Sequence, residues 1–488
     1  MLLLSFLTAI IASGPPATAA ASLLETRQST PASAVCSNYN GTYKLTNITA
    51  PVRGLGTQPA GSQPWGLFLN DTAAAYRQNV TGFGAAVTDA TVVNFNRLTS
   101  AQQTSLLNVL MTAGPSNSAN FSLMRHTIGS SDLSATNYTY NDGARDPSLA
   151  NFALGPNGTA MASLLAKMRT SAPAMTLLGS AWSAPGWMKR NGALTGNATN
   201  NNLLDRYLDP TEDNLADPYA NYFVKYLQAY ANAGAPVNAI TIQNEPLFST
   251  ASYPSMYVYD YENAALIQKF VGPAITRASL NTQIWGYDHN LDQPVYAQRI
   301  LDNAPVNTIA WHCYSSQPWS VMSDFKANNT GVIQYMTECW TPSSQPWYNA
   351  AAFTLGPLQN WGSGAIAWNL ASDVNNGPYI YGGCSSCQGL VTVRNDRTYT
   401  LNTAYYMMAQ FSRYMPKGST VVPLTGNGGN GNGDVQSIAT VNPNGSRTVV
   451  ILNTFANPVF MQMNTTSGTV WSGSLPPSSV VTWVLPRA

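Results

Sequence analysis

The stretch AITIQNEP, residues 239–246, is a short apolar run that ends in a carboxylate, Glu245. A second stretch, IQYMTECW at residues 333–340, repeats this pattern with Glu338 near its end. Runs of this length and composition predict buried β-strands. A carboxylate at the end of a buried strand is costly unless it is paired, hydrogen-bonded or used in chemistry. The two stretches therefore indicate both the kind of sheet and the place where function is expected.

The region around these stretches alternates short apolar runs with amphipathic patterns, such as residues 219–231 and 261–270. Eight strand–helix units between about residues 80 and 370 predict an α/β fold, a (β/α)8 TIM barrel. An open doubly wound sheet is the alternative, but no GxGxxG motif follows the first strand. Glu245 and Glu338 then end the fourth and seventh strands, nearly opposite each other at the barrel mouth. The predicted strands end near Ala86, Gly129, Trp182, Asn244, Asp288, Tyr314, Glu338 and Asn369.

After about residue 390 the pattern changes to short β runs, such as residues 448–452 and 479–484, beside a Gly/Asn-rich turn at 426–433. These runs predict a β-sandwich appended to the barrel. We expect four parts in chain order: a signal peptide at 1–20, with a propeptide to about residue 27 as an option, an N-terminal segment at 28–78 that contributes to the β-sandwich, the (β/α)8 barrel at 79–389, and the C-terminal β-sandwich at 390–488.

The N-terminus carries an apolar run at residues 2–12 that is too short to span a bilayer. Small residues follow at 17–20, so the pattern predicts a signal peptide cleaved near Ala20 and a secreted, extracellular protein. The lack of Lys and Arg before the run is atypical, and a buried helix is the alternative. No later stretch reaches transmembrane length, so we expect no integral membrane association.

The chain is poor in charge, with 9% charged residues and 23 basic against 22 acidic side chains. Because no run of Lys or Arg stands out, we expect no nucleic-acid partner. We expect a monomer whose surface is hydrated by neutral polar residues and glycans. Sequons for N-glycosylation occur at Asn40, Asn47, Asn70, Asn79, Asn120, Asn137, Asn157, Asn197, Asn328, Asn444 and Asn464.

The cysteines are odd in number, five in all. Cys384 and Cys387 form a CxxC, a pattern that in a cytosolic protein suggests redox or metal chemistry. There is no second CxxC and no histidine at ligand spacing, so a short structural disulfide is expected. Cys313 and Cys339 pair with each other if their strands are neighbours, which leaves Cys36 unpaired.

The glutamates are few, and only Glu245 and Glu338 end apolar strands. Glu25 lies in the leader region, Glu212 lies in a polar loop-like run, and Glu262 lies in a helical stretch where we expect it to be solvated. Two converging carboxylates among aromatic residues suit glycosidic bond cleavage. The alternative is two buried carboxylates in structural hydrogen-bond networks. A serine hydrolase is disfavoured because no GxSxG motif is present.

The motifs at the predicted strand ends are GFGAAVTD at 82–89, RHTIGSSD at 125–132, SAWSAPGWMK at 180–189, QNEP at 243–246, WHCY at 311–314, TECW at 337–340 and WNL at 368–370. In identity and order they resemble family 30 of the glycoside hydrolases, within the clan of (β/α)8 retaining glycosidases. The resemblance runs from about residue 80 to the end and is specific for the family, whereas a lone Asn-Glu-Pro indicates only the clan. One departure is Gly84-Ala85, where the family often has Gly-Gly, which puts an extra methyl on the pocket floor.

The resemblance implies that Glu245 is the acid/base and Glu338 the nucleophile. It implies that Asn244 hydrogen-bonds the sugar 2-hydroxyl and that Arg125 keeps the nucleophile ionised by its opposite charge. Taken singly, Arg125 would also fit a purely structural ion pair. Catalysis of this kind needs a raised pKa for Glu245 and a low pKa for Glu338, with the two carboxyl groups about 5–5.5 Å apart.

The resemblance also implies which residues bind the sugar. His312 and Tyr314 would line the pocket, and Asp132, Trp182 and Trp368 would hold the terminal sugar. Tryptophan rings stack on the apolar faces of pyranose rings while carboxylates bind the hydroxyls. Without the resemblance, a core histidine and packed core tryptophans would be the better interpretation. No metal and no cofactor are implied.

Residues 244–248, 253–257 and 285–290 resemble the fungal subgroup that acts on β-1,6-glucan. This implies a secreted, retaining, endo-β-1,6-glucanase-like enzyme with a polysaccharide substrate. The same fold and mechanism on β-1,6-galactan, glucuronoxylan or glucosylceramide is one alternative. An alternative of another class is a non-catalytic sugar-binding or wall protein.

Overall fold

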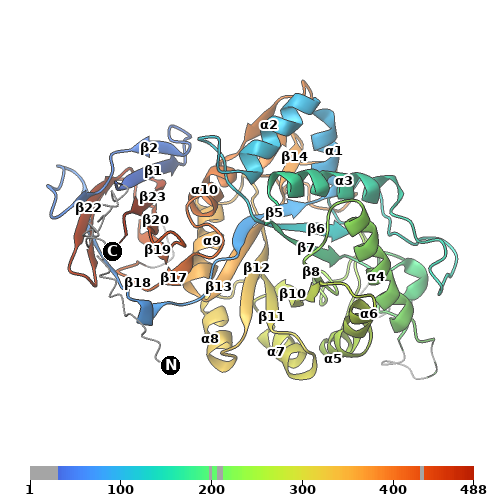
Figure 1. The fold of residues 1–488 in the computed structure, drawn as a ribbon. Coiled ribbons are helices and arrows are strands. Elements are labelled where there is room, and N and C mark those ends of the chain that lie inside the picture. The colour runs from blue at the N-terminus through green and yellow to red at the C-terminus, as the bar shows by residue number, and fades with distance from the viewer. Residues whose placement is uncertain (1–30, 197–200, 206–210, 212, 429–432, 488) are drawn as a thin grey trace, which may run out of the picture.

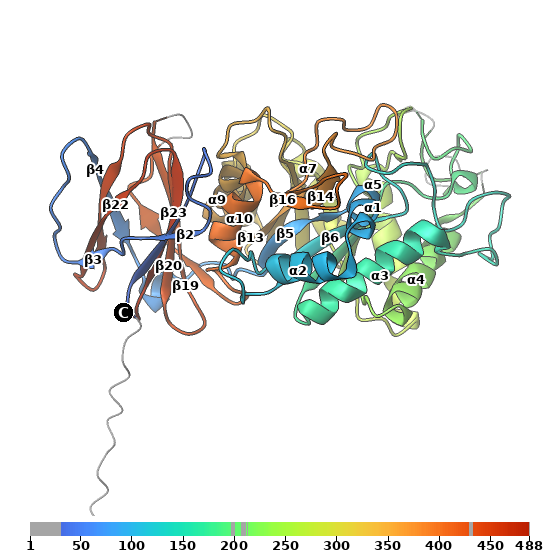
Figure 2. The ribbon, with the colours of Figure 1, turned by 90° about the horizontal axis from the view of Figure 1, so that it is seen from above.

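The computed structural model describes residues 31–196, 201–205, 211, 213–428 and 433–487. Two bodies lie side by side, a barrel and a β-sandwich (Figures 1 and 2). The expected signal peptide, its propeptide option and the sequon at Asn197 lie outside the described residues. In the described part of the chain, no helix has both the length and the apolar character needed to cross a membrane.

The barrel is a ring of parallel strands, as the sequence predicts. Its fifth position is shared by two short strands, β9 and β10, which Trp285 separates and which close the ring on β8 and β11. All eight predicted strand ends fall at or within a few residues of an observed strand end, which confirms the barrel. The strands are β5 (Gly82–Val87), β6 (Leu123–Ile128), β7 (Thr176–Ala181), β8 (Ala239–Thr241), β9 (Gln283–Ile284), β10 (Gly286–Asn290), β11 (Thr308–His312), β12 (Ile333–Trp340) and β13 (Gly362–Trp368).

Helices surround the ring of strands (Figure 1). Their starts follow ordinary capping chemistry: Thr88 accepts from the Thr91 N–H, and Thr99 with Gln102 forms a capping box. A π-helical stretch, Leu266–Val271, lies between two short α-helices. The helices are α1 (Asp89–Arg97), α2 (Ser100–Met111), α3 (Gly155–Ser171), α4 (Ala216–Asn232), α5 (Asp260–Ala265), α6 (Gly272–Arg277), α7 (Pro294–Asn303), α8 (Ser320–Asn328), α9 (Asn349–Gln359) and α10 (Thr403–Ser412).

The interior of the barrel is packed rather than open. The rings of Trp285 and Tyr335 stack with centroids 4.2 Å apart, and buried aliphatic residues of other barrel strands pack with them. At Gly84, a Cβ would lie 2.0 Å from the Leu123 carbonyl oxygen, so β5 and β6 approach too closely for any side chain. Because side chains fill the interior of the barrel, a functional cavity is expected above them, at the carboxyl ends of the strands.

The β-sandwich combines strands from both ends of the chain, and Figure 1 shows the first strands lying among the last ones. One sheet has the order β17-β19-β20-β23-β1-β2 and the other β18-β4-β21-β22-β3. A three-stranded sheet, β14-β15-β16, follows the barrel. These strands are β1 (Ser33–Asn38), β2 (Thr46–Ile48), β3 (Val52–Arg53), β4 (Gln63–Leu69), β14 (Ala371–Asp373), β15 (Val391–Val393), β16 (Tyr399–Leu401), β17 (Thr420–Val422), β18 (Leu424–Thr425), β19 (Val435–Val441), β20 (Arg447–Asn453), β21 (Val459–Thr465), β22 (Val470–Leu475) and β23 (Ser479–Leu485).

Helix α10 joins the two bodies. Gln410 on this helix donates to Ser37 Oγ at 2.7 Å and accepts from Thr482 Oγ1 at 2.6 Å, and all three residues are buried. The helix also packs on α9 and β5 of the barrel. Because α10 contacts both bodies, the expected division near residue 390 stays a prediction.

Two disulfides are present among the described residues. Cys384 bonds to Cys387, and Cys313 bonds to Cys339. The second bond confirms the conditional expectation, because Cys313 follows β11 and Cys339 lies on the neighbouring strand β12. Cys36 is a buried free thiol, and burial raises its pKa to about 12.

The expectation that Glu262 is solvated is wrong. Its side chain on α5 is fully buried, and its Oε2 accepts the Tyr259 N–H at 3.0 Å. Burial raises the pKa of Glu262, and the nearby carboxylate of Asp205 raises it further. Helical periodicity alone could not show that a second carboxylate lies against this face.

We expect the protein to lose stability as the pH rises above about 4.3, where the unfolded chain releases the proton that folded Glu262 retains. Glu262→Gln keeps an acceptor for the Tyr259 N–H and removes this titration. Its melting temperature should exceed that of the wild type by about 2–4 °C at pH 7 and match it near pH 4. Thermal unfolding across this range tests the prediction, with the exposed Asp324→Asn as the matched control. An equal gain at both pH values would contradict it.

Candidate active site

A cavity of about 360 Å³ opens at the carboxyl ends of the barrel strands. Most of the predicted site residues form its wall. Arg125 and His312 instead lie beneath it, both fully buried. The predicted residues on the wall are Asp132, Trp182, Asn244, Glu245, Tyr314, Glu338 and Trp368. The barrel therefore brings residues from distant parts of the sequence to one place.

Arg125, on β6, is the cation at the centre of the site. Its guanidinium donates to Glu338 Oε2, to Asn244 Oδ1 at 2.6 Å and to Asp288 Oδ2 at 2.8 Å. The guanidinium carbon also lies 5.0 Å from the ring centre of Trp182, within the range of a cation–π contact. A planar, permanently charged donor can hold several acceptors in one fixed arrangement.

Asp288, at the bulged end of β10, is a residue whose role the sequence analysis missed. Besides Arg125, it accepts hydrogen bonds from the hydroxyls of Ser180, Thr241 and Thr337, each at 2.7 Å. It is fully buried, and the positive charges of Arg125 and His312 outweigh burial and lower its pKa. The signal was present, because Asp288 is also a carboxylate that ends an apolar strand.

His312 links this buried carboxylate to Glu245. Its Nε2 lies 3.0 Å from Asp288 Oδ1, and its Nδ1 lies 3.1 Å from Glu245 Oε1. His289, which the sequence analysis did not assign to the site, places its Nδ1 3.7 Å from the same Glu245 oxygen. The acid/base candidate is therefore flanked by two imidazoles.

The two glutamates share one cleft. His312 Nδ1 lies 3.1 Å from Glu245 Oε1 and 4.0 Å from Glu338 Oε1. These distances limit the separation of the two oxygens to about 7 Å. The two carboxyl groups of inverting glycosidases are about 6.5–9.5 Å apart, so most of that range is excluded here. Tyr314 donates its hydroxyl to Glu338 Oε1 at 2.8 Å, so both oxygens of Glu338 are held.

The backbone is strained where these residues lie. Glu245 has φ 46°, Tyr287 has φ 78° and Asp288 has φ 68°, a left-handed region that non-glycine residues rarely adopt. The Glu245 N–H donates to the Asp288 carbonyl at 3.0 Å, which ties the two strained segments together. Such conformations cost about 1–3 kcal/mol each and persist where the surroundings fix them.

The charges set where the protons reside. Burial raises the pKa of Glu245, but the hydrogen bonds and positive charges of His289 and His312 outweigh burial and lower it. Burial lowers the pKa of His312, but the charges of Glu338 and Asp288 raise it to about 9. Burial raises the pKa of Glu338 against the opposing effects of His312 and Arg125.

These directions reverse the expectation of a raised pKa for Glu245 and a low pKa for Glu338. The physical reason is the pair of imidazoles beside Glu245, which the sequence did not reveal. The lowered pKa of Glu245 and the raised pKa of His312 both favour a proton on His312, one hydrogen bond away from Glu245. Arg125 and Tyr314 both donate to Glu338, and these hydrogen bonds favour its ionised form against the effect of burial.

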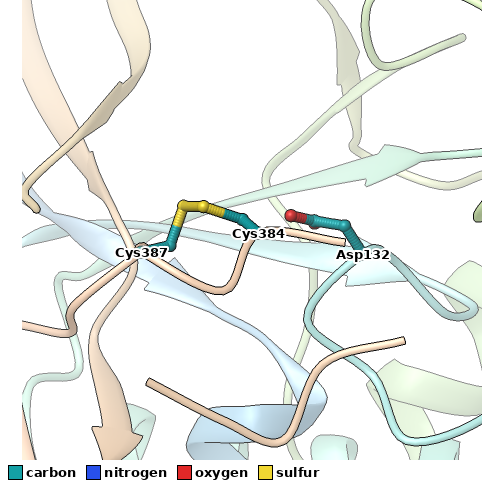
Figure 3. Close-up of side chains that lie close together, drawn as sticks. All are labelled: Asp132, Cys384 and Cys387. Carbon is teal, nitrogen blue, oxygen red and sulfur yellow. A yellow bond between two sulfur atoms is a disulfide. The ribbon is translucent and has the colours of Figure 1, made fainter. Parts of the chain in front are cut away.

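Aromatic and acidic residues form the deep end of the cavity. The rings of Trp182 and Trp368 stack with centroids 5.2 Å apart. Asp132 lies beside the Cys384–Cys387 disulfide (Figure 3). Burial and the charge of Glu338 raise the pKa of Asp132 to about 7. Phe248, Tyr253 and Trp340, none of them assigned a role from the sequence, also line the cavity.

Two clusters have the side chains of a metal site. In the first, the sulfurs of Cys384 and Cys387 are bonded to each other, so no thiolate is left to act as a ligand (Figure 3). In the second, Glu245 with His289 and His312, both ring nitrogens of His312 already lie at hydrogen-bond distance from carboxylates. The first cluster therefore lacks the thiolates of a metal centre, and in the second His312 is hydrogen-bonded to both Glu245 and Asp288.

Two models of one protein family match most of the chain. The family models named glycosyl hydrolase family 30 TIM-barrel domain and glycosyl hydrolase family 30 beta sandwich domain match residues 80–415 and 418–483. Endo-1,6-beta-D-glucanase neg1 of Aspergillus fumigatus is 56% identical over 470 residues, covering 94% of this chain and 95% of the relative. Endo-1,6-beta-D-glucanase BGN16.3 of Trichoderma harzianum is 51% identical, covering 93% of each.

The fold has a solved counterpart in the endo-β1,6-glucanase BT3312. That structure superposes with a TM-score of 0.80 at 24% identity and covers 94% of this chain and 99% of the other. At this identity the likeness concerns the fold alone. Because the family models together span the barrel and the sandwich, the chain belongs to glycoside hydrolase family 30.

Proposed function

We propose that the protein is a secreted, retaining glycosidase that hydrolyses the β-1,6-glucosidic linkages of β-1,6-glucan, such as pustulan or fungal cell-wall glucan. The observation that carries the proposal is the placement of Glu245 and Glu338 in one cleft, both within 4.0 Å of a single nitrogen of His312. The linkage is supported by two relatives above 50% identity whose names state endo-1,6-beta-D-glucanase activity.

In the first step, a carboxylate oxygen of Glu338 attacks the anomeric carbon, and the bond from that carbon to the glycosidic oxygen breaks. Glu245 gives its proton to the departing oxygen, which leaves as an alcohol. Asn244 is held at Arg125 Nη2, in place to bind the sugar 2-hydroxyl. Arg125 and Tyr314 hold the nucleophile, each through a different oxygen.

His312 Nδ1 supplies the proton for this step to Glu245 Oε1 through the hydrogen bond between them. When the proton moves from His312 Nδ1 to Glu245 Oε1, the imidazole becomes neutral and its Nε2–H still donates to Asp288. In the second step, Glu245 takes a proton from water, whose oxygen attacks the anomeric carbon and releases Glu338. Glu245 then passes this proton back to His312 Nδ1 through the same hydrogen bond, which restores the starting charges of both residues.

The eight sequons with exposed asparagines, at Asn40, Asn47, Asn79, Asn137, Asn157, Asn328, Asn444 and Asn464, support secretion with surface glycans. The cavity holds few charges besides the catalytic pair and Asp132, which suits a neutral glucan better than a uronate-bearing chain. A substrate panel of β-1,6-glucan, β-1,6-galactan, glucuronoxylan and glucosylceramide, with product sizing and linkage analysis, tests the assignment. Release of reducing sugar from none of them would favour a non-catalytic binding protein.

Glu338→Gln should abolish turnover of β-1,6-glucan, with kcat falling on the order of 10⁴-fold or more because no nucleophile remains. Its affinity for the polysaccharide should persist, since the tryptophans and Asp132 are untouched. Reducing-sugar assays and affinity electrophoresis in pustulan gels measure the two quantities. Appreciable turnover by the variant would rule out Glu338 as the nucleophile.

Glu245→Gln should behave differently with different leaving groups. Turnover of β-1,6-glucan should fall by about 10²–10⁴-fold, the usual contribution of general acid catalysis. Formation of the glycosyl-enzyme from 2,4-dinitrophenyl β-glucoside should fall far less, because that leaving group departs without a proton. Pre-steady-state release of dinitrophenol measures this step. Equal losses on both substrates would exclude Glu245 as the acid.

His312→Gln should shift the alkaline limb of the kcat/KM profile to lower pH, because the wild-type pair holds its proton on His312, whose pKa is raised to about 9. A glutamine at this position can still donate to Asp288, so the cleft should keep its shape. Tyr253→Phe, on the cavity wall, is the control and should leave the limb in place. An unmoved limb in the His312 variant would show that the proton is stored elsewhere.

A further inference from the structure

The CxxC segment closes over Asp132. The sulfurs of Cys384 and Cys387 and a carboxylate oxygen of Asp132 all lie within 4.8 Å of one another (Figure 3). The backbone N–H of Cys384 is close enough to the carboxylate to stabilise its charge. The Ile380 N–H donates to the Asp132 carbonyl at 2.9 Å. The segment thus contacts both the side chain and the backbone of this residue.

Gly383 shows how closely the segment fits. A Cβ built on Gly383 would lie 2.6 Å from the Asp132 carbonyl oxygen and 2.9 Å from that of Ile380. Contacts this short to backbone atoms cannot be relieved by moving a flexible side chain. The residue before Cys384 is therefore a glycine for steric reasons.

The other end of the disulfide is anchored in the floor of the cavity. Cys387 is only 3% exposed and packs in one buried cluster with Trp182 and Trp368. Its carbonyl accepts the Asn369 side-chain N–H at 3.2 Å. The disulfide therefore joins Cys384, which lies at Asp132, to Cys387, which packs against the tryptophan pair. The residues between the two cysteines, Ser385 and Ser386, are exposed.

Dithiol chemistry is a poor use for this pair. A reactive cysteine needs a positive neighbour that stabilises its thiolate. Here the carboxylate of Asp132 lies within 4.8 Å of both sulfurs and would disfavour a thiolate at Cys384, and Cys387 is buried. The surroundings suit a fixed bridge rather than a redox centre.

We propose that the Cys384–Cys387 disulfide is a positioning element for the terminal-sugar subsite, holding the Asp132 carboxylate at a fixed angle to the Trp182–Trp368 pair. The inference rests on the proposed function. Asp132 would bind hydroxyls of the terminal glucose in the ground state and the transition state alike, whereas bond cleavage depends on Glu245 and Glu338. Loss of such uniform binding raises KM and leaves kcat nearly unchanged.

The test is the double variant Cys384→Ser/Cys387→Ser, assayed on β-1,6-glucan. KM should rise about 10-fold, the equivalent of one lost hydrogen bond to a charged group, while kcat stays within about twofold. Ser385→Ala, which alters the exposed middle of the same loop and keeps the disulfide, should leave both constants unchanged. An unchanged KM in the folded double variant would overturn the inference.

A double-mutant cycle shows whether the disulfide acts through Asp132. In an Asp132→Asn background, which has its own raised KM, removing the disulfide should change KM by less than about twofold. An undiminished further rise would mean that the disulfide acts on something else, and the inference would fail.

If the double variant does not fold, the folded wild type can be treated with a phosphine reductant and the opened bond located by alkylation and peptide mapping. Enzyme opened only at Cys384–Cys387 should show the same rise in KM, and an unchanged KM would refute the inference. Failure of the proposed function looks different. The untreated wild type would then release no sugar from β-1,6-glucan, and both proposals would fall together.

Discussion

The site depends on one buried cation. Arg125 is fully removed from water and is shared by Glu338, Asp288 and Asn244. An unpaired guanidinium in this position would be prohibitively costly, as would two buried carboxylates without it. Each charge is therefore tolerable only because the others are present, and the arrangement has little freedom to relax. A carboxylate held in this way is positioned before a substrate arrives, so the nucleophile proposed here needs no reorganisation at the moment of reaction.

The same constraint decides where the proton can be stored. The negative charges of Glu338 on the cavity wall and of Asp288 beneath it stabilise a positive imidazole at His312, although burial alone would favour the neutral ring. The resting charge of Glu245 is thus compensated by a proton one hydrogen bond away. Under the proposed mechanism, Glu245 serves as the acid without a raised pKa of its own, because His312 holds the proton between turnovers. This solution differs from a carboxyl kept neutral by an apolar pocket.

The sequence predicted the parts of the site that follow from strand ends. In a chain with 9% charged residues, a glutamate that ends an apolar run is conspicuous, and the barrel topology brings such ends together. Glu245, Glu338 and the strand order could therefore be predicted. Asp288 carried the same signal, but among many aspartates it was not distinctive. The burial of Glu262 was missed because periodicity describes one helix, whereas its burial depends on a partner carboxylate elsewhere in the chain.

The pKa directions could not be predicted, because they depend on which groups meet across the barrel. His289 and His312 come from neighbouring strands that both carry an irregularity, between Tyr287 and His289 on β10 and between Trp311 and His312 on β11. The bulge in β10 puts Tyr287 and Asp288 at positive φ and aims the Asp288 carboxylate inward, under His312. A one-residue irregularity therefore places the anion that keeps His312 protonated and the imidazole that flanks the acid. No pattern of apolar residues encodes such a bulge, yet the charge state of Glu245 depends on it.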